Sequence, residues 1–423
     1  MRFFSTLPFL AMLALPRPAL AQVAVADSGD TGWMILCALL VLLAALPGLM
    51  LRHAGLVNVR SALSVMAQGA GVAAAACLTW GIVGYSLTYA PGGDWLGGSA
   101  NLLLANLGQL RDGLTVPESA FVLFQLALAL LAAGLLVGAV TERTAIGWWI
   151  AFTPLWLLMV YVPVAHAVWA GGWLAGLGVM DFAGGLVVHG VAGFSALALA
   201  LIAGKRAAPS NPGHAPVLAI AGGALLWIGL SGMVGGWALG ATDDAATAML
   251  NHQFAACAAA LTWALVDKLL GARSSATGIA SGALAGIVAI SASAALVGTG
   301  GAMLIGIIAA LVCRLATALV SHRIDDGAGV FIIHGLGGVT GTLLLPIFVL
   351  PLLGGVGFEG NISLSGALVS QLVGVVVIAL WAMVGSAIAA LIVSVVIPMR
   401  VSAQAEAEGL DATQHGQQGW DFR

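Results

Sequence analysis

Charged residues are scarce in this chain: 14 Lys and Arg and 17 Asp and Glu make up only 7% of its 423 residues, against about 25% in an ordinary soluble domain. Hydrophobic residues make up 61%, and the mean hydropathy is +1.07. This composition excludes a soluble fold. The net charge of -3 gives no reason to expect a nucleic-acid partner. The four cysteines lie in apolar runs without metal-ligand spacing, so we expect them to be packing residues.

The apolar runs are about 20 residues long and do not alternate, which predicts membrane-spanning helices and excludes the strands of a membrane barrel. Glycine, with 58 residues, allows such helices to approach closely. The expected fold is an all-α membrane protein of eleven transmembrane helices. The predicted spans are 32–52, 62–90, 119–141, 146–170, 182–204, 215–240, 246–270, 276–297, 300–320, 328–352 and 364–398.

The first 21 residues have the features of a secretory signal peptide. Arg2 precedes an apolar stretch, and Ala19-Leu20-Ala21 forms a small-residue cleavage site. We therefore expect a signal peptide over 1–21, a transmembrane transporter domain over 22–398 and a cytoplasmic regulatory tail over 399–423. Apart from Arg2 and Arg17, eleven of the remaining twelve Lys and Arg, Arg52 among them, fall on one side of the predicted spans. The positive-inside rule then predicts an N-out, C-in orientation in a bacterial inner membrane.

A short internal echo links the fifth and tenth predicted spans. Val187-Val188-His189-Gly190 resembles Ile332-Ile333-His334-Gly335, five spans later. Since five is odd, the two halves run in opposite senses, as in the inverted repeats of many transporters. We expect a repeat of five plus five spans with one extra helix.

His189 and His334 are ionisable residues deep inside predicted spans, where such groups are expensive and mark function by default. The alternative is two separate buried histidines, each bonded to a carbonyl. Two imidazoles that share a hydrogen bond would offer one donor and one acceptor on a conduction path. A metal site would need a third ligand, and none lies at helical spacing; we expect no metal and no cofactor.

Further candidates lie toward the outer ends of the spans. Asp181 is either a helix N-cap or an anion that draws cations to the path, and the two roles are compatible. Trp169 is an interfacial anchor or an aromatic surface for a small cation. Phe124 and Gln125 lie in the outer half of the third span. We expect His166 and His252 to be structural residues near headgroups or water, and the pairs Asp243-Asp244 and Asp325-Asp326 to begin helices.

Several motifs together resemble the ammonium transporter (Amt/Mep/Rh) family, over nearly the whole chain after the predicted leader. The tail resembles the Amt branch, from Arg400-Val401-Ser402 through Gly409-Leu410-Asp411 to His415-Gly416. The other motifs are Asp30-Thr31-Gly32-Trp33-Met34, Pro47-Gly48 with Gly55-Leu56-Val57, Gly84-Tyr85-Ser86-Leu87, Ala165-His166-Ala167-Val168-Trp169 and Asp181-Phe182-Ala183-Gly184-Gly185.

The resemblance implies a homotrimer with one pore per subunit, an outer ammonium site, and PII-type regulatory proteins as possible partners of the tail. It assigns His189 and His334 to the twin histidines, Asp181 to the essential acidic residue, Trp169 to the vestibule tryptophan, and Phe124 and Gln125 to an aromatic–glutamine pair. The departures cluster at the outer site. Leu128 and Met233 replace gate phenylalanines, Leu230 a pore tryptophan, Trp237 the vestibule serine, Val234 an asparagine and Ser291 a threonine.

Aromatic residues replaced by Leu and Met remove cation–π partners worth roughly 0.5–2 kcal/mol each, which predicts weaker recruitment of ammonium. The favoured function is ammonium or ammonia transport through a twin-histidine pore. An ammonium sensor, and a channel for another small neutral gas or amine, are the alternatives. An intramembrane enzyme is disfavoured because no nucleophile, metal triad or carboxylate pair accompanies the histidines.

Overall fold

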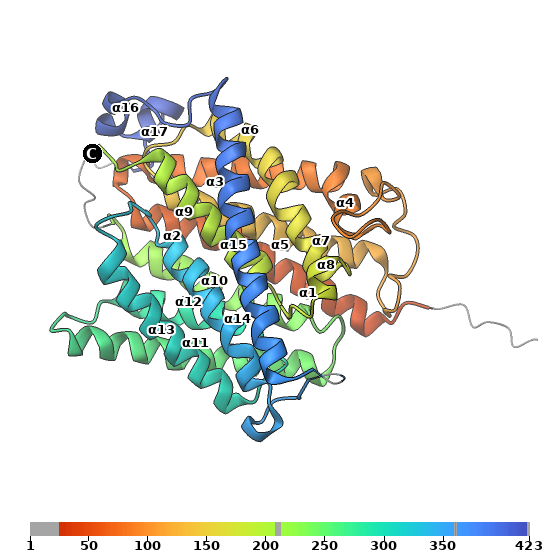
Figure 1. Ribbon diagram of the computed structural model, residues 1–423. Coiled ribbons are helices and arrows are strands. Elements are labelled where there is room, and N and C mark those ends of the chain that lie inside the picture. The colour runs from red at the N-terminus through yellow and green to blue at the C-terminus, as the bar shows by residue number, and fades with distance from the viewer. Residues whose placement is uncertain (1–24, 208–212, 359, 361, 421–423) are drawn as a thin grey trace, which may run out of the picture.

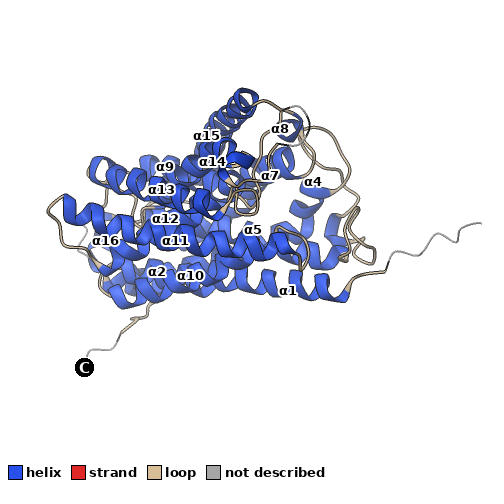
Figure 2. Ribbon diagram, turned by 90° about the horizontal axis from the view of Figure 1, so that it is seen from below, coloured by secondary structure: helices blue, strands red, loops and turns tan. Residues whose placement is uncertain are grey.

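The computed structural model describes residues 25–207, 213–358, 360 and 362–420. The predicted signal peptide, 1–21, lies outside these residues. Within them the chain is helical, with two isolated β-bridges and no strand (Figure 2). The all-α prediction is confirmed.

Ten described helical segments are long and apolar enough to cross a membrane, and Ala276–Ile290 is a shorter apolar helix of 15 residues. The main elements are α1 (Ser28–Leu43), η2 (Ala44–Gly48), α2 (Leu49–Leu56), α3 (Ala62–Thr79), η4 (Trp80–Gly84), α4 (Tyr85–Tyr89), α5 (Glu118–Val137), α6 (Ile146–Trp156), η7 (Leu157–Tyr161), α7 (Val162–Trp169), η8 (Gly185–Gly190), α9 (Val191–Ala203), α10 (Pro216–Gly236), α11 (Asp243–Leu269), α12 (Ala276–Ile290), α13 (Thr299–Val320), η9 (Phe331–Leu336), α14 (Gly337–Phe348), α15 (Leu364–Ser394), α16 (Ala403–Glu408) and α17 (Leu410–His415).

Each predicted span coincides with a helix or with a continuous run of helices. The span predicted over 276–297 departs most, because α12 ends at Ile290 and residues 291–296 form turns. Ser291 donates its hydroxyl to the carbonyl of Ile287, 2.8 Å away, at this end of α12. The count of eleven crossings, which requires α12 to cross, stays a prediction.

The two ends of the described chain lie on opposite faces of the bundle. At the start of α1, Asp30 accepts the amide of Ala241 at 2.9 Å. At the other end of the run Ser28–Leu56, the amide of Asn58 donates to Glu142 Oε1 at 3.0 Å. The helices α16 and α17 cover this second face, which we call the tail face (Figure 1). The face where α1 begins is called the opposite face.

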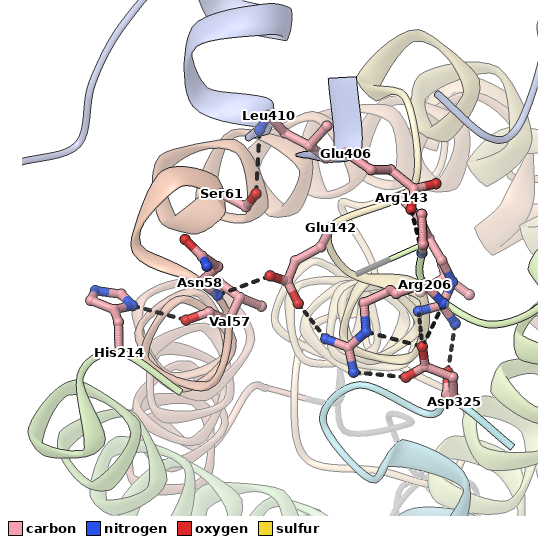
Figure 3. Close-up of polar contacts among 12 residues, drawn as sticks. Val57, Asn58, Ser61, Glu142, Arg143, Arg206, His214, Asp325, Glu406 and Leu410 are labelled. Atoms are coloured by element: carbon pink, nitrogen blue, oxygen red, sulfur yellow. Dashed lines mark hydrogen bonds and ion pairs between the residues drawn. The ribbon is translucent and has the colours of Figure 1, made fainter. Parts of the chain in front are cut away.

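The tail is held on its face by specific contacts. Asp411 accepts the backbone amides of Leu63 and Ser64 at 3.2 and 2.7 Å, next to the start of α3. The amide of Leu410 donates to Ser61 Oγ at 3.2 Å (Figure 3). Arg400 forms an ion pair with Glu406, its Nε lying 2.5 Å from Oε1. The segment after the last long helix is therefore a docked element.

An ion-pair network on the tail face joins loops that are distant in sequence. Arg206 lies between Glu142 and Asp325 and pairs with both, its Nη2 lying 2.7 Å from Asp325 Oδ1 (Figure 3). Arg143 adds a second pair to Asp325 at 3.4 Å. Burial raises the pKa of Asp325, but hydrogen bonds from Arg206 outweigh it, so the pKa lies below its ordinary value. Asp325 is thus a charged partner of arginines, which corrects the prediction that it serves a helix start.

Candidate functional site

His189 and His334 lie side by side in the interior. Their Nδ1 atoms are 3.1 Å apart, which is hydrogen-bond distance, and their ring centroids are 5.0 Å apart with 39° between the planes. His189 is fully buried and His334 is 5% exposed. The alternative of two separate histidines, each bonded to a carbonyl, is wrong. One ring donates and the other accepts, so the pair shares a proton between two nitrogens.

Each histidine lies on a π-helical turn with an aspartate eight residues before it. His189 belongs to η8 and His334 to η9. Asp181 accepts the amides of Gly184, Leu186 and Val187 at 3.1, 2.9 and 2.8 Å. Asp326 accepts the amides of Val330 and Phe331 at 2.9 and 2.8 Å. The predicted capping role of Asp181 is therefore observed, and Asp326 is its equivalent on the tail face.

The two aspartates also have similar electrostatics. Burial raises the pKa of each carboxyl to about 6, although the backbone N–H groups that they accept favour the charged form. Both groups therefore titrate near neutral pH. The sequence analysis did not single out Asp326 from its neighbour Asp325. The equal spacing of eight residues before each histidine was the signal that would have found it.

Close backbone contact at the crossing of the two repeats brings the histidines together. A Cβ on Gly193, in α9, would lie 2.1 Å from the backbone nitrogen of Gly335, in η9. A Cβ on Gly338 would lie 2.3 Å from the carbonyl oxygen of Gly185. Only glycine fits at this distance. The glycines next to both histidines thus set the separation of the two π turns.

Aromatic side chains gather next to Asp181 on the opposite face. Trp169 donates its indole N–H to the carbonyl of Asp181 at 2.9 Å. Trp237 packs on Trp169 with ring centroids 4.2 Å apart, and Phe124 meets Trp237 edge-on at 6.2 Å. The indole nitrogen of Trp237 is buried without a hydrogen-bond partner. A tryptophan therefore covers Trp169 where the resemblance expects a small serine.

The remaining sequence candidates are all closed off from solvent. Leu128, Met233 and Leu230 are fully buried and belong to the same hydrophobic cluster as Phe124. Gln125 is also fully buried, and neither atom of its amide has a hydrogen-bond partner. An amide left unpaired inside a span is costly, so Gln125 is a polar group available to a guest molecule.

Two histidines lie in other surroundings than the sequence suggests. His166 is 3% exposed, and its ring nitrogens lie 2.7 Å from the carbonyl oxygens of Thr88 and Gly93. His252 is fully buried, with Nε2 3.1 Å from the carbonyl oxygen of Trp227. Neither ring is near headgroups or water as expected, because the loops and helices around them cover both. Their structural role agrees with these contacts.

A polar pocket of about 220 Å³ opens beside the second π turn on the tail face. Asp326, Phe331 and Ile332 line it together with Arg206 and Asp325 of the ion-pair network. It comes within two residues of His334 along the chain. The arrangement as a whole is a buried pair of imidazoles between two capped helix starts, one on each face, and it suits passage of a small polar molecule.

Comparison with known proteins gives the same class. Residues 32–420 match the model of the Ammonium Transporter Family. A putative ammonium transporter of Methanothermobacter thermautotrophicus is 38% identical over 93% of this chain and 98% of its own length. An ammonium transporter of Bacillus subtilis is 35% identical over 93% of this chain and 98% of its own length.

Solved structures of two kinds resemble this fold. A structure described as "Sensor Amt Protein" has a TM-score of 0.86 and 28% identity, covering 92% of this chain and 98% of its own. Candida albicans Mep2 has a TM-score of 0.82 and 31% identity, covering 89% of this chain and 87% of its own. The helices and the matches define a multi-pass membrane protein of the transporter class. The chain belongs to the ammonium transporter family.

Proposed function

We propose that this protein moves ammonium or ammonia across the membrane along a path through His189 and His334. The observation that carries this proposal is the 3.1 Å contact between their Nδ1 atoms on matching π turns. The pair exposes a polar edge in an apolar interior, where a molecule with one lone pair and several N–H bonds finds both an acceptor and a donor. The relatives named as ammonium transporters support the same cargo.

The outer end of the path is a weakened cation site. Asp181 supplies negative charge, and Trp169, Phe124 and Gln125 supply aromatic surface and an unpaired amide. Leu128, Met233 and Leu230 add no cation–π partner, and Trp237 covers one side of Trp169. We expect ammonium to bind there more weakly than at a site lined by aromatic side chains.

Placement in the cell follows from the distribution of basic residues. We propose that the tail face is cytoplasmic, with Arg143, Arg206 and Arg400 on it, and that the chain is N-out and C-in in a bacterial inner membrane. The proposed parts are a signal peptide over 1–21, a transporter domain over 22–398 and a regulatory tail over 399–423. The family resemblance supports a homotrimer and a PII-type partner at the tail.

A sensor is the second candidate function. The features that favour it are the replaced aromatic positions Leu128 and Met233, which are fully buried, and the likeness to the structure described as a sensor. A sensor would bind ammonium at Asp181 and Trp169 and report through the docked tail, with little net transport. A channel for another small neutral gas or amine would keep the path and change the cargo.

Proteoliposomes test the proposal. Ammonium pulses are applied to vesicles that hold the wild type, His189→Ala, His334→Ala, or the control His322→Ala on an exposed turn, while current and internal pH are recorded. We expect a response in the wild type and in the control, and its loss in both pore variants. A folded wild type without response would contradict transport and favour the sensor. An equal response to other amines, with none specific to ammonium, would favour the broader channel.

A further inference from the structure

Arg52 is a cationic side chain buried inside the first span. It lies in the last two turns of α2 and is only 5% exposed. Its Nη2 donates to Ser281 Oγ, in α12, at 3.1 Å, and its Nη1 lies beside Gly223 of α10. The sequence analysis counted Arg52 among the basic residues that flank a span, but the side chain points into the bundle, between α10 and α12.

No carboxylate neutralises this charge. Among the ion pairs of the described residues, Arg143, Arg206, Arg314 and Arg400 each have an acidic partner within 4.0 Å, and Arg52 has none. An unpaired arginine inside a span is expensive unless it faces a water-filled or polar path. The position of Arg52 therefore calls for a functional explanation.

Arg52 lies in the tail-face half of the proposed path. Arg52 and its neighbour His53 are close enough to His334 to act on it electrostatically. The His53 ring reaches Gly138 and Ala328, and Ala328 precedes His334 by six residues. Arg52, His53 and His334 are 5%, 3% and 5% exposed, whereas His189, Leu128, Leu230 and Met233 have no exposed surface. The accessible side of the histidine pair is thus the side on which Arg52 lies.

We propose that Arg52 is a specificity-determining residue that keeps cations out of the tail-face half of the path, so that only neutral ammonia completes the crossing. This inference rests on the proposed function and adds which chemical form moves. Ammonium gives its proton to water at the opposite face, ammonia crosses, and it takes a proton from water at the tail face. A fixed unit charge about 10 Å from a passing cation lowers its occupancy roughly tenfold at an effective dielectric constant of about 20.

The test uses the full-length protein in proteoliposomes. Arg52→Met removes the charge at similar length, and Arg52→Lys keeps the charge. Arg323→Met, on an exposed turn, is the matched control. Current and internal pH are recorded after pulses of ammonium, methylammonium and potassium, and size-exclusion chromatography checks that each variant is folded. Arg52→Gln replaces Arg52→Met if the latter does not fold.

We expect ammonium to alkalinise wild-type vesicles with almost no current. Arg52→Met should gain a current of on the order of tenfold or more with at least one of the three cations, while Arg52→Lys and Arg323→Met stay like the wild type. Unchanged cation currents in folded Arg52→Met and Arg52→Gln would overturn the inference, as would an ammonium current in the wild type. A wild type that ignores ammonium refutes the proposed function alone, because a cation current gained only by Arg52→Met would still support the filter.

Discussion

Asp181 and Asp326 occupy equivalent positions in the two halves of the protein: each caps the π turn that carries a pore histidine, from eight residues upstream. One lies on each face of the bundle. The inverted repeat therefore extends beyond the histidines to the groups that fix their helices.

Replacing a capping aspartate by alanine should loosen the turn that it holds. Asp326→Ala loses two backbone hydrogen bonds, and loss of such a cap is worth about 0.5–2 kcal/mol. We expect a lower melting temperature in detergent and a weaker ammonium response, because His334 is no longer fixed against His189. Asp326→Asn keeps one acceptor and should fall in between. Asp112→Ala, at an exposed loop position, is the control; equal effects from Asp112 and Asp326 would contradict this role.

External pH should control recruitment of ammonium through Asp181. Burial raises the pKa of this carboxyl to about 6 from its ordinary 3.8. As external pH falls from 7 to 5 the carboxyl takes up a proton, and the ammonium response should fall with it. Asp181→Asn should remove this step from the pH profile. Internal pH is held at 7, so that Asp326 on the tail face keeps its charge.

The same raised pKa has a consequence for folding, with the opposite sign. Between about pH 6 and 4 the folded protein binds this proton more readily than the unfolded chain does. The contribution of Asp181 to the free energy of unfolding should therefore increase as pH falls through that window. Melting curves of the wild type and Asp181→Asn between pH 4 and 7 measure it; parallel curves would contradict the shift.

Gly193 should not tolerate a side chain. A Cβ there would lie 2.1 Å from the nitrogen of Gly335, so the two π turns would have to separate. We expect Gly193→Ala to destabilise the fold by about 1–3 kcal/mol or more and to remove the ammonium response. Gly300→Ala is the matched control, because a Cβ at Gly300 has nothing within 4 Å. Equal melting temperatures for the two variants would show that the crossing is looser than described.

Trp237→Ser should strengthen ammonium recruitment. The change uncovers the face of Trp169 that now lies 4.2 Å from the Trp237 ring, and it adds a hydroxyl acceptor. A newly available cation–π contact is worth roughly 0.5–2 kcal/mol, so the half-saturating ammonium concentration should fall about 2- to 30-fold. Trp237→Phe keeps the site covered and should behave like the wild type. A higher half-saturating concentration in Trp237→Ser would mean that Trp237 itself holds the cation.

Glu406→Ala should release the tail from its face. Glu406 holds Arg400 and accepts the amide of Ala207 at 2.9 Å, so its loss leaves both groups without a partner. We expect faster proteolysis within α16, together with a loss of about 1–3 kcal/mol for the charged hydrogen bonds. Glu408→Ala, which removes only an exposed contact to Gln404, is the control. Identical digestion of the two variants would rule out a tail held by Glu406.

Sequence patterns were sufficient for the helices and the histidine pair. Long apolar runs fix where a chain can cross a membrane, and only two histidines fell at equivalent positions of a repeat. The direction of a side chain was harder to predict. Arg52 lies near a span end, where a long side chain normally reaches for the interface, but the glycines of α10 leave room for it inside. Asp325 and Asp326 are adjacent in sequence and have different partners, which only the fold around Arg206 decides.

Five of the described helical runs contain a π turn: η2, η4, η7, η8 and η9. Each such turn is an α-helix with one surplus residue, so the side chains beyond it are rotated by about 100° relative to those before it. One helical wheel therefore cannot represent such a span from end to end. The stripe of residues facing lipid changes phase partway through the bilayer, and a single-residue deletion in η9 would turn everything after it to a different neighbour while leaving the hydropathy profile nearly unchanged.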